Sequence, residues 1–229
     1  MRKAVAQNPN TSEESLKNLY KDKNRDVRWA VASNSSTSPE ILESLSKDEE
    51  SDVRRAVAQN PYTPQNLIKN LSEDEEVNVR KAVAANPSTD KETLEIISRD
   101  NEQSVRYGVA TNPNAPLKVL KKLSIDEDWA VRTVIAQNIS IDQDTLKNLS
   151  KDGEFYVRRA VAQNPNTDQD TLKNLSKDGE SEVRRAVAQN LNADQEILKE
   201  LSKDVNFYVQ MAVARNPNTD LDKLKFVEE

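Results

Sequence analysis

Apolar residues return along the chain with a fixed period of 26 residues. Valine stands at every twenty-sixth position from Val27 to Val209, and Met1 lies one period before Val27. If each repeat is numbered from this position, apolar or small residues fall at positions 1, 4 and 5, and leucine or isoleucine falls at 16 and 19. Both spacings are typical of one face of a helix. The pattern predicts helix A over about positions 24 to 7 and helix B over about positions 12 to 20.

Polar residues predict where these helices begin and end. Acidic residues crowd positions 22–26, where they suit the free N–H groups and the dipole at the start of helix A. An Asn-Pro pair ends helix A, because the residue before a proline avoids helical angles. A threonine followed three residues later by glutamate predicts a capping box at the start of helix B. These pairs are Thr11/Glu14, Thr37/Glu40 and Thr89/Glu92.

Helices this short are not stable alone, so burial must come from neighbouring repeats. The sequence therefore predicts an all-α solenoid with two short helices per repeat and no β-sheet, forming a single domain over residues 1–229. Small residues at positions 4 and 6 would let successive A helices pack closely, which leaves positions 3, 7 and 25 for the outer face. The repeats start at residues 1, 27, 53, 79, 105, 131, 157, 183 and 209, and the last is truncated.

The motif Val-Arg-Arg-Ala-Val-Ala-x-Asn-Pro-Asn-Thr, with Leu-x-x-Leu and Asp further on, resembles the leucine-rich repeat variant family. The resemblance covers essentially the whole chain. It implies a right-handed superhelix of alternating α- and 3₁₀-helices, so that one helix of each pair is α and the other α or 3₁₀. Some members of the family carry an iron–sulfur cluster on cysteines, which this cysteine-free chain has no means to bind.

Composition removes many kinds of chemistry. The chain has no cysteine and no histidine, which excludes disulfides, the usual zinc and iron–sulfur ligands, and imidazole acid–base catalysis. No combination of catalytic residues is apparent, so we expect neither an enzyme nor a bound metal or cofactor. No apolar run is long enough to span a membrane and the first residues resemble no secretory signal, which favours a cytoplasmic protein. The net charge of −6 does not indicate nucleic acid.

Two polar positions recur in nearly every repeat. Arginine at position 2, from Arg2 to Arg184, could form a phosphate-binding row, but the acids beside it favour internal ion pairs with the aspartate at position 22 or an acid at position 26 of the preceding turn. Asparagine at position 8, from Asn8 to Asn216, is expected to satisfy open backbone groups at the turn between helices A and B.

Aromatic residues gather at positions 25, 26 and 3, where the sequence also varies most from repeat to repeat. A fixed scaffold with one variable ridge suits a non-catalytic protein that binds a protein or peptide partner. The other interpretation is that these rings shield helix starts or fill gaps between repeats. The candidate partner-binding residues are Trp29, Tyr107, Trp129, Phe155, Tyr156, Phe207, Tyr208 and Met211. Those from Phe155 onward form the preferred patch.

Two other functions remain open. The first is nucleic-acid binding through the basic residues at positions 2 and 3, with the more exposed position 3 as the better candidate, namely Lys3, Arg55, Lys81, Arg159 and Arg185. The second is a structural spacer within a larger protein. No polar cap is evident at the ends of the array, so head-to-tail self-association is a further expectation.

Overall fold

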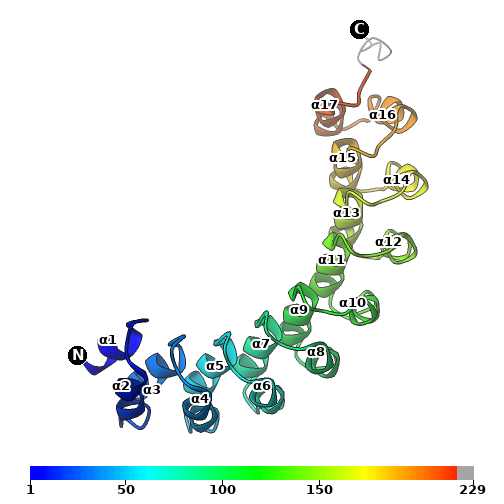
Figure 1. Cartoon of the computed structure of the whole chain (residues 1–229). Helices are drawn as coiled ribbons and strands as arrows, with labels where there is room; N and C mark the ends of the chain where they lie inside the picture. Colours follow the sequence, from blue (N-terminus) through cyan, green and yellow to red (C-terminus); the bar gives the residue numbers. More distant parts are fainter. Residues whose placement is uncertain (221–229) are drawn as a thin grey trace. The chain divides into compact units, whose positions relative to one another are not determined.

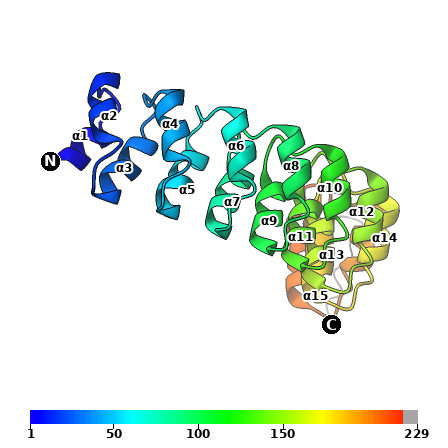
Figure 2. The same cartoon turned by 90° about the horizontal axis from the view of Figure 1, so that it is seen from below.

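The computed structural model describes residues 1–220, which fold into α-helices joined by short turns, with no β-strand in that range. Two compact units, Met1–Val119 and Leu120–Glu229, are distinguished by their internal contacts. Within each unit, odd-numbered helices lie side by side in one row and even-numbered helices in another (Figures 1 and 2). That the whole chain forms one continuous domain remains a prediction.

The helices follow the predicted period of 26 residues. In the first unit they are α1 (Arg2–Gln7), α2 (Glu13–Leu19), α3 (Arg25–Ala32), α4 (Pro39–Leu45), α5 (Ser51–Gln59), α6 (Gln65–Leu71), α7 (Val77–Ala85), α8 (Lys91–Ile97) and α9 (Gln103–Thr111). Next comes α10 (Leu117–Leu123). In the second unit they are α11 (Trp129–Gln137), α12 (Gln143–Leu149), α13 (Phe155–Gln163), α14 (Gln169–Leu175), α15 (Ser181–Gln189), α16 (Gln195–Leu201) and α17 (Phe207–Arg215).

Both helices of each pair are α-helices throughout residues 1–220. From α5 to α17, the A helices have nine residues and run from position 25 to position 7, close to the predicted bounds. The B helices have seven residues, positions 13 to 19. The alternative of a 3₁₀-helix is therefore wrong for the described pairs. The second helix of the ninth repeat lies outside the described residues.

The capping-box prediction is wrong. Position 12, not the threonine at 11, caps helix B: the carboxylate of Asp168, for example, accepts a hydrogen bond of 2.8 Å from the Thr171 N–H. The threonine at position 11 is buried between the helices instead, and the Thr37 hydroxyl donates to the Val31 carbonyl over 2.6 Å. Burial decides this outcome, because a buried hydroxyl must find its partner within the protein.

The core lies between the two rows and between consecutive A helices. Val157 and Val161 of α13 and Leu172 of α14 are fully buried, and the same repeat positions are buried in nearly every repeat. Consecutive A helices, such as α13 and α15, contact each other directly. Burial is therefore supplied mainly by the preceding and following repeats, as expected for a solenoid.

Asparagine at position 8 joins each repeat to the one before it. The Asn164 amide donates to the Ala136 carbonyl over 2.7 Å and to the Asn138 carbonyl over 3.2 Å, and its oxygen accepts from the Asn166 N–H over 2.9 Å. The prediction for this position is confirmed. Within the described part of the two units, the same pair of carbonyl bonds is made by Asn34, Asn60, Asn86, Asn112, Asn164, Asn190 and Asn216.

Helices α7 and α9 pack closely against each other at Gly108. It occupies position 4, where most repeats have alanine, and a Cβ at Gly108 would lie 2.8 Å from the Cβ of Ala84 on the preceding A helix. Because an alanine Cβ moves only with its backbone, α7 and α9 would have to separate. We expect Gly108→Ala to lower the free energy of unfolding by about 1 kcal/mol, since overpacking outweighs the gain in helix propensity.

Gly153 and Gly179 are the matched controls for this measurement. Both lie in turns with open space around the Cβ direction, and their φ angles are not positive. Gly153→Ala should therefore stabilise the protein by about 0.4–1 kcal/mol through the unfolded state. Equal effects of the two substitutions in urea denaturation would contradict the close packing of α7 on α9.

Candidate binding face of the A helices

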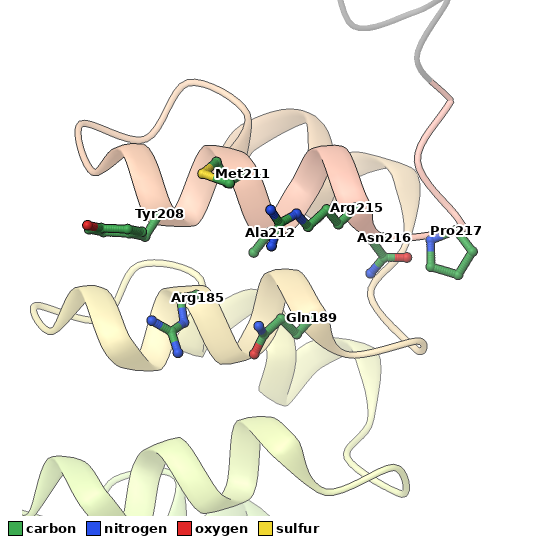
Figure 3. Close-up of a pocket in the computed structure, with 8 residues that line it drawn as sticks. All are labelled: Arg185, Gln189, Tyr208, Met211, Ala212, Arg215, Asn216 and Pro217. Carbon is green, nitrogen blue, oxygen red and sulfur yellow. The ribbon is translucent and has the colours of Figure 1, made fainter.

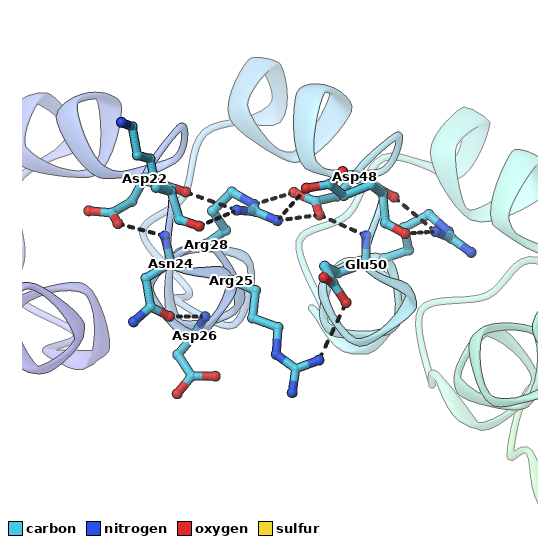
Figure 4. A network of polar contacts seen from close by, with 10 residues as sticks. Asp22, Asn24, Arg25, Asp26, Arg28, Asp48 and Glu50 are labelled. Carbon is cyan, nitrogen blue, oxygen red and sulfur yellow. Dashed lines mark hydrogen bonds and ion pairs between the residues drawn. The ribbon is translucent and has the colours of Figure 1, made fainter.

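Arginine at position 2 is used inside the scaffold. Nε of Arg28 lies 2.6 Å from Oδ2 of Asp48, and Nη2 donates to Oδ1 over 2.9 Å (Figure 4). Nη1 donates over 2.9 Å to the Asp22 carbonyl of the preceding repeat. The same two contacts, with an aspartate 20 residues later and a carbonyl six residues earlier, join adjacent repeats at Arg28, Arg54, Arg80, Arg132, Arg158 and Arg184.

This pairing confirms that internal ion pairs use the arginine row. The sequence placed the partner acid in the preceding turn, whereas the structure has only a carbonyl there and the carboxylate in the following turn. Two-point bonding to a nearly buried carboxylate is a strong form of ion pair. The equivalent Nε–Oδ2 distances are 2.6–2.7 Å for Arg28, Arg54, Arg80, Arg132, Arg158 and Arg184.

The same pairs make stability depend on pH. Burial opposes ionisation of Asp178, but hydrogen bonds from the Arg158 guanidinium and the Glu180 N–H outweigh it and lower the pKa of this carboxyl. The pKa values of Asp74, Asp100, Asp152 and Asp204 are lowered as well. For Asp142, hydrogen bonds from Lys121 and Thr145 lower the pKa to about 2.

The melting temperature should therefore fall when the solution is made acidic. A carboxyl whose folded pKa lies below its unfolded value stabilises the fold above the unfolded value and loses that effect as pH falls through the folded pKa. We expect the melting temperature to be nearly constant down to about pH 5 and to fall below about pH 4. Asp178→Asn should reduce this acid dependence, and an unchanged dependence in that variant would contradict the assignment.

Positions 25, 26, 3 and 7 form the outer side of each A helix, named here the A face. On α15 and α17 these positions are exposed or half-buried, whereas positions 1, 4 and 5 are buried. On α15 this face carries Glu182, Arg185 and Gln189, and on α17 it carries Tyr208, Met211 and Arg215. Gln189 and Arg215, which lie at position 7, were not among the site residues predicted from the sequence.

In the second unit, the predicted aromatic residues form two groups on the A face. Trp129 of α11 stacks on Tyr156 of α13 with ring centroids 4.9 Å apart, and the ring centroids of Phe155 and Tyr156 are 4.0 Å apart. On α17, the rings of Phe207 and Tyr208 meet edge to face at 6.0 Å. Because α15 lies between α13 and α17, the preferred patch is divided rather than continuous.

The aromatic side chains of these two groups differ in how exposed they are to solvent. Tyr156 is 40% exposed and Phe155 is half-buried, whereas Phe207 and Tyr208 are 65% and 64% exposed. Met211 beside them is half-buried. The rings on α17 are therefore far more available to a partner than Phe155 is.

The first unit carries the other two predicted aromatic residues. Trp29 is half-buried, and the Lys3 ammonium lies 5.7 Å from its ring centre. Around Trp29, Lys3, Arg55, Asp26 and Asp52 line a shallow pocket of about 260 Å³. The lining of this pocket therefore carries both acidic and basic side chains. Tyr107 is 39% exposed on α9.

The candidate anion-binding residues at position 3 are accessible, but several already face an acid. Nζ of Lys3 lies 3.3 Å from Asp26, and nitrogens of Arg55 and Arg185 lie 3.0 Å from Asp52 and 3.4 Å from Glu182. The Arg159 guanidinium lies over the Tyr156 ring at 5.8 Å, and Lys81 is exposed. A phosphate would have to compete with these carboxylates.

A pocket of about 330 Å³ lies between α15 and α17 (Figure 3). Arg185 and Gln189 project into it from α15, and Arg215 reaches toward the same space from α17. Its lining residues are Arg185, Gln189, Tyr208, Met211, Ala212, Arg215, Asn216 and Pro217. This pocket combines cationic, amide and apolar groups on one part of the A face.

Among residues 1–220, no three acidic side chains gather closely enough to hold a metal ion. No helix in that range is both long and apolar enough to cross a membrane.

Comparison with solved structures identifies the same architecture. A leucine-rich repeat variant with a novel repetitive structural motif is 27% identical, with a TM-score of 0.76, covering 94% of this chain and 86% of its own. YibA of E. coli is 16% identical with a TM-score of 0.56, covering 93% of this chain and 94% of its own. The condensin Cnd3–Cnd2 subcomplex of S. pombe is 16% identical with a TM-score of 0.51, covering 93% of this chain and 37% of its own.

The last two similarities concern the fold alone. No family model matches the sequence, and the search of curated proteins returned no match. The repeat period, the regular helix pairs and the similarity to the solved variant agree with one another. The chain has the repeat architecture of a leucine-rich repeat variant.

Proposed function

We propose that this repeat scaffold is non-catalytic and binds a protein or peptide through the A face. The observation that carries the proposal is that Phe207 and Tyr208 are 65% and 64% exposed on α17, directly beside the buried Val209. Large aromatic side chains held open to solvent in a group are typical of interaction sites. The scaffold would then use the fixed positions for stacking and the variable positions for recognition.

Position 3 supports this division of roles. Along the array it carries Lys, Trp, Arg, Lys, Tyr, Thr, Arg, Arg and Met, whereas position 1 is valine in every repeat after the first. Residues that stack the repeats cannot vary freely, because each contacts two neighbours. Variation at an exposed position changes what the surface recognises at little cost to the fold.

Nucleic-acid binding has less support. The arginines at position 2 are held by aspartates, and Lys3, Arg55 and Arg185 face carboxylates. A nucleic-acid site needs cations that are free to replace counterions at phosphates. We therefore favour a polypeptide partner, and nucleic acid becomes one outcome of the test.

The test is a selection of short random peptides displayed on phage against the full chain. Selected peptides should bind in solution, and Tyr208→Ala should weaken them by about tenfold, because exposed tyrosines are frequent anchors of binding energy. Tyr62→Ala is the matched control: Tyr62 is 65% exposed, nearly the same as Tyr208, but lies at position 10, outside the A face. It should leave binding unchanged.

Three results would overturn the proposal. The first is a selection that enriches no peptide, which would favour a spacer. The second is an equal loss of binding in the Tyr62 and Tyr208 variants. The third is salt-dependent retention on single-stranded DNA that competes with every selected peptide.

A further inference from the structure

The pocket between α15 and α17 has an unusual balance of charge for this chain. The protein is acidic, with a net charge of −6, yet no carboxylate among residues 1–220 lines this pocket. Two guanidinium groups do, those of Arg185 and Arg215. The local field therefore favours an anionic group.

Both arginines are available to a new partner. Arg215 has no ion-pair partner among residues 1–220. Arg185 has only Glu182 at 3.4 Å, with the two side chains 39% and 45% exposed, and such exposed pairs are weak and screened by salt. The preceding residue, Arg184, shows the contrast: it lies 2.6 Å from Asp204 and belongs to the scaffold.

The rest of the pocket is apolar or able to form hydrogen bonds. Met211 and the buried Ala212 form an apolar lining beside the Tyr208 ring, and methionine adapts to irregular side chains. The Gln189 amide is exposed and has no hydrogen-bond partner among residues 1–220. Asn216 is already used by the Ala188 and Asn190 carbonyls.

The size of the pocket limits its occupant. Its volume of about 330 Å³ lies at the lower end of ligand pockets. This space suits one large side chain of a polypeptide, with neighbouring groups lying along the A face. Arg185 on α15 and Arg215 on α17 would then contact groups on either side of that side chain (Figure 3).

We propose that this pocket binds an acidic peptide segment in which carboxylates flank one large apolar residue. The apolar side chain would lie against Met211 and Tyr208, and the carboxylates would pair with Arg185 and Arg215. The Gln189 amide would hydrogen-bond the peptide backbone. This inference rests on the proposed function, and adds the chemistry of the partner and its place on the second unit.

The first unit provides the internal comparison. Its pocket beside Trp29 is lined by Asp26 and Asp52 as well as by basic residues, so it does not favour an acidic occupant. Arg55 lies at the same repeat position as Arg185 and likewise pairs with an acid three residues earlier. Arg55→Gln is therefore the matched control for Arg185→Gln.

The experiment measures fluorescence anisotropy of two labelled synthetic peptides with the full chain. One has a phenylalanine flanked on both sides by aspartate and glutamate, and the other has lysine in place of every acid. We expect the acidic peptide to bind and the lysine peptide not to bind. Arg185→Gln and Arg215→Gln should each weaken the acidic peptide by about tenfold, and Arg55→Gln should not change its affinity. Replacing the phenylalanine of the peptide with glycine should cause a similar loss.

Charge reversal gives the sharpest result. The double variant Arg185→Glu/Arg215→Glu should lose the acidic peptide and gain the lysine peptide, and both surface changes should leave the fold intact. Equal binding of the two peptides by the unmodified protein would overturn the inference. So would an Arg55→Gln effect as large as that of Arg185→Gln, or displacement of the acidic peptide by single-stranded DNA.

Failure of this inference can be distinguished from failure of the proposed function. If the acidic peptide does not bind but the phage selection yields peptides that depend on Tyr208, the partner chemistry is wrong and the A face still binds a polypeptide. If neither the acidic peptide nor any selected peptide binds, both proposals fail.

Discussion

Arg158→Ala is expected to lower the free energy of unfolding by about 2–4 kcal/mol, the largest effect anticipated for any single substitution considered for this chain. The side chains of Arg158 and Asp178 are 18% and 8% exposed, with Nε and Oδ2 2.6 Å apart. Removing the arginine leaves a nearly buried carboxylate without its counter-charge. It also removes the hydrogen bonds to the Asp152 and Gly153 carbonyls. Urea denaturation measures the loss.

The protein itself offers the control for this prediction. Gln210 occupies the same position in the ninth repeat and donates to the Asp204 carbonyl over 2.7 Å. Arg158→Gln should thus restore a carbonyl bond while still lacking the ion pair, and its stability should lie between those of the alanine variant and the unmodified protein. If both variants were as stable as the unmodified protein, the arginine row would have no structural role.

Asn164→Ala is expected to lower the free energy of unfolding by about 1–3 kcal/mol. The substitution removes the donor to two carbonyls of the preceding repeat and the acceptor of the Asn166 N–H. Since the Asn164 side chain is only 2% exposed, water cannot easily replace these bonds. Differential scanning calorimetry should show a clearly lower melting temperature.

Asn166→Ala is the matched control for that measurement. Asn166 is an exposed asparagine two residues further on, and its amide donates to the Ile139 carbonyl over 2.6 Å. Because solvent can replace an exposed bond, this variant should lose only a few tenths of a kcal/mol. An effect equal to that of Asn164→Ala would mean that burial is not what makes position 8 important.

Much of the fold could be predicted because the repeat presents the same signal many times. The spacing of Val157, Val161 and Leu172 identifies two helical faces in one copy, and the other copies repeat it in fixed phase. Asn164 could be assigned to the scaffold since it precedes a proline at a helix end. These features depend on neighbours within a few residues, which the sequence displays directly.

The remaining features depend on how far one repeat is offset from the next. Asp152 precedes Arg158 by six residues and Asp178 follows it by 20, and only the packing determines that the carboxylate of Asp178 binds it while Asp152 offers its carbonyl. The capping error at Thr37 has a similar origin, since the threonine turns inward to a carbonyl six residues earlier.

The binding face was predicted only in part for the same reason. Tyr208 and Met211 could be identified because they interrupt the repeat. Gln189 and Arg215 could not, because position 7 is usually an ordinary polar residue and gains meaning only where α15 and α17 enclose a pocket. The signal that could have found Arg215 was the change from glutamine to arginine at position 7 in the last repeat, whereas glutamine at this position, as in Gln189, is common in the other repeats.

We propose that some positions of the repeat stack the scaffold while others recognise a partner. The double variant Tyr208→Glu/Met211→Arg tests it most directly, because it gives α17 the residues that α15 carries as Glu182 and Arg185. Peptide affinity should fall at least about tenfold while urea denaturation stays within about 0.5 kcal/mol of the unmodified protein. Unchanged affinity together with a marked loss of stability would contradict the claim, because it would mean that these side chains shield the helices rather than bind.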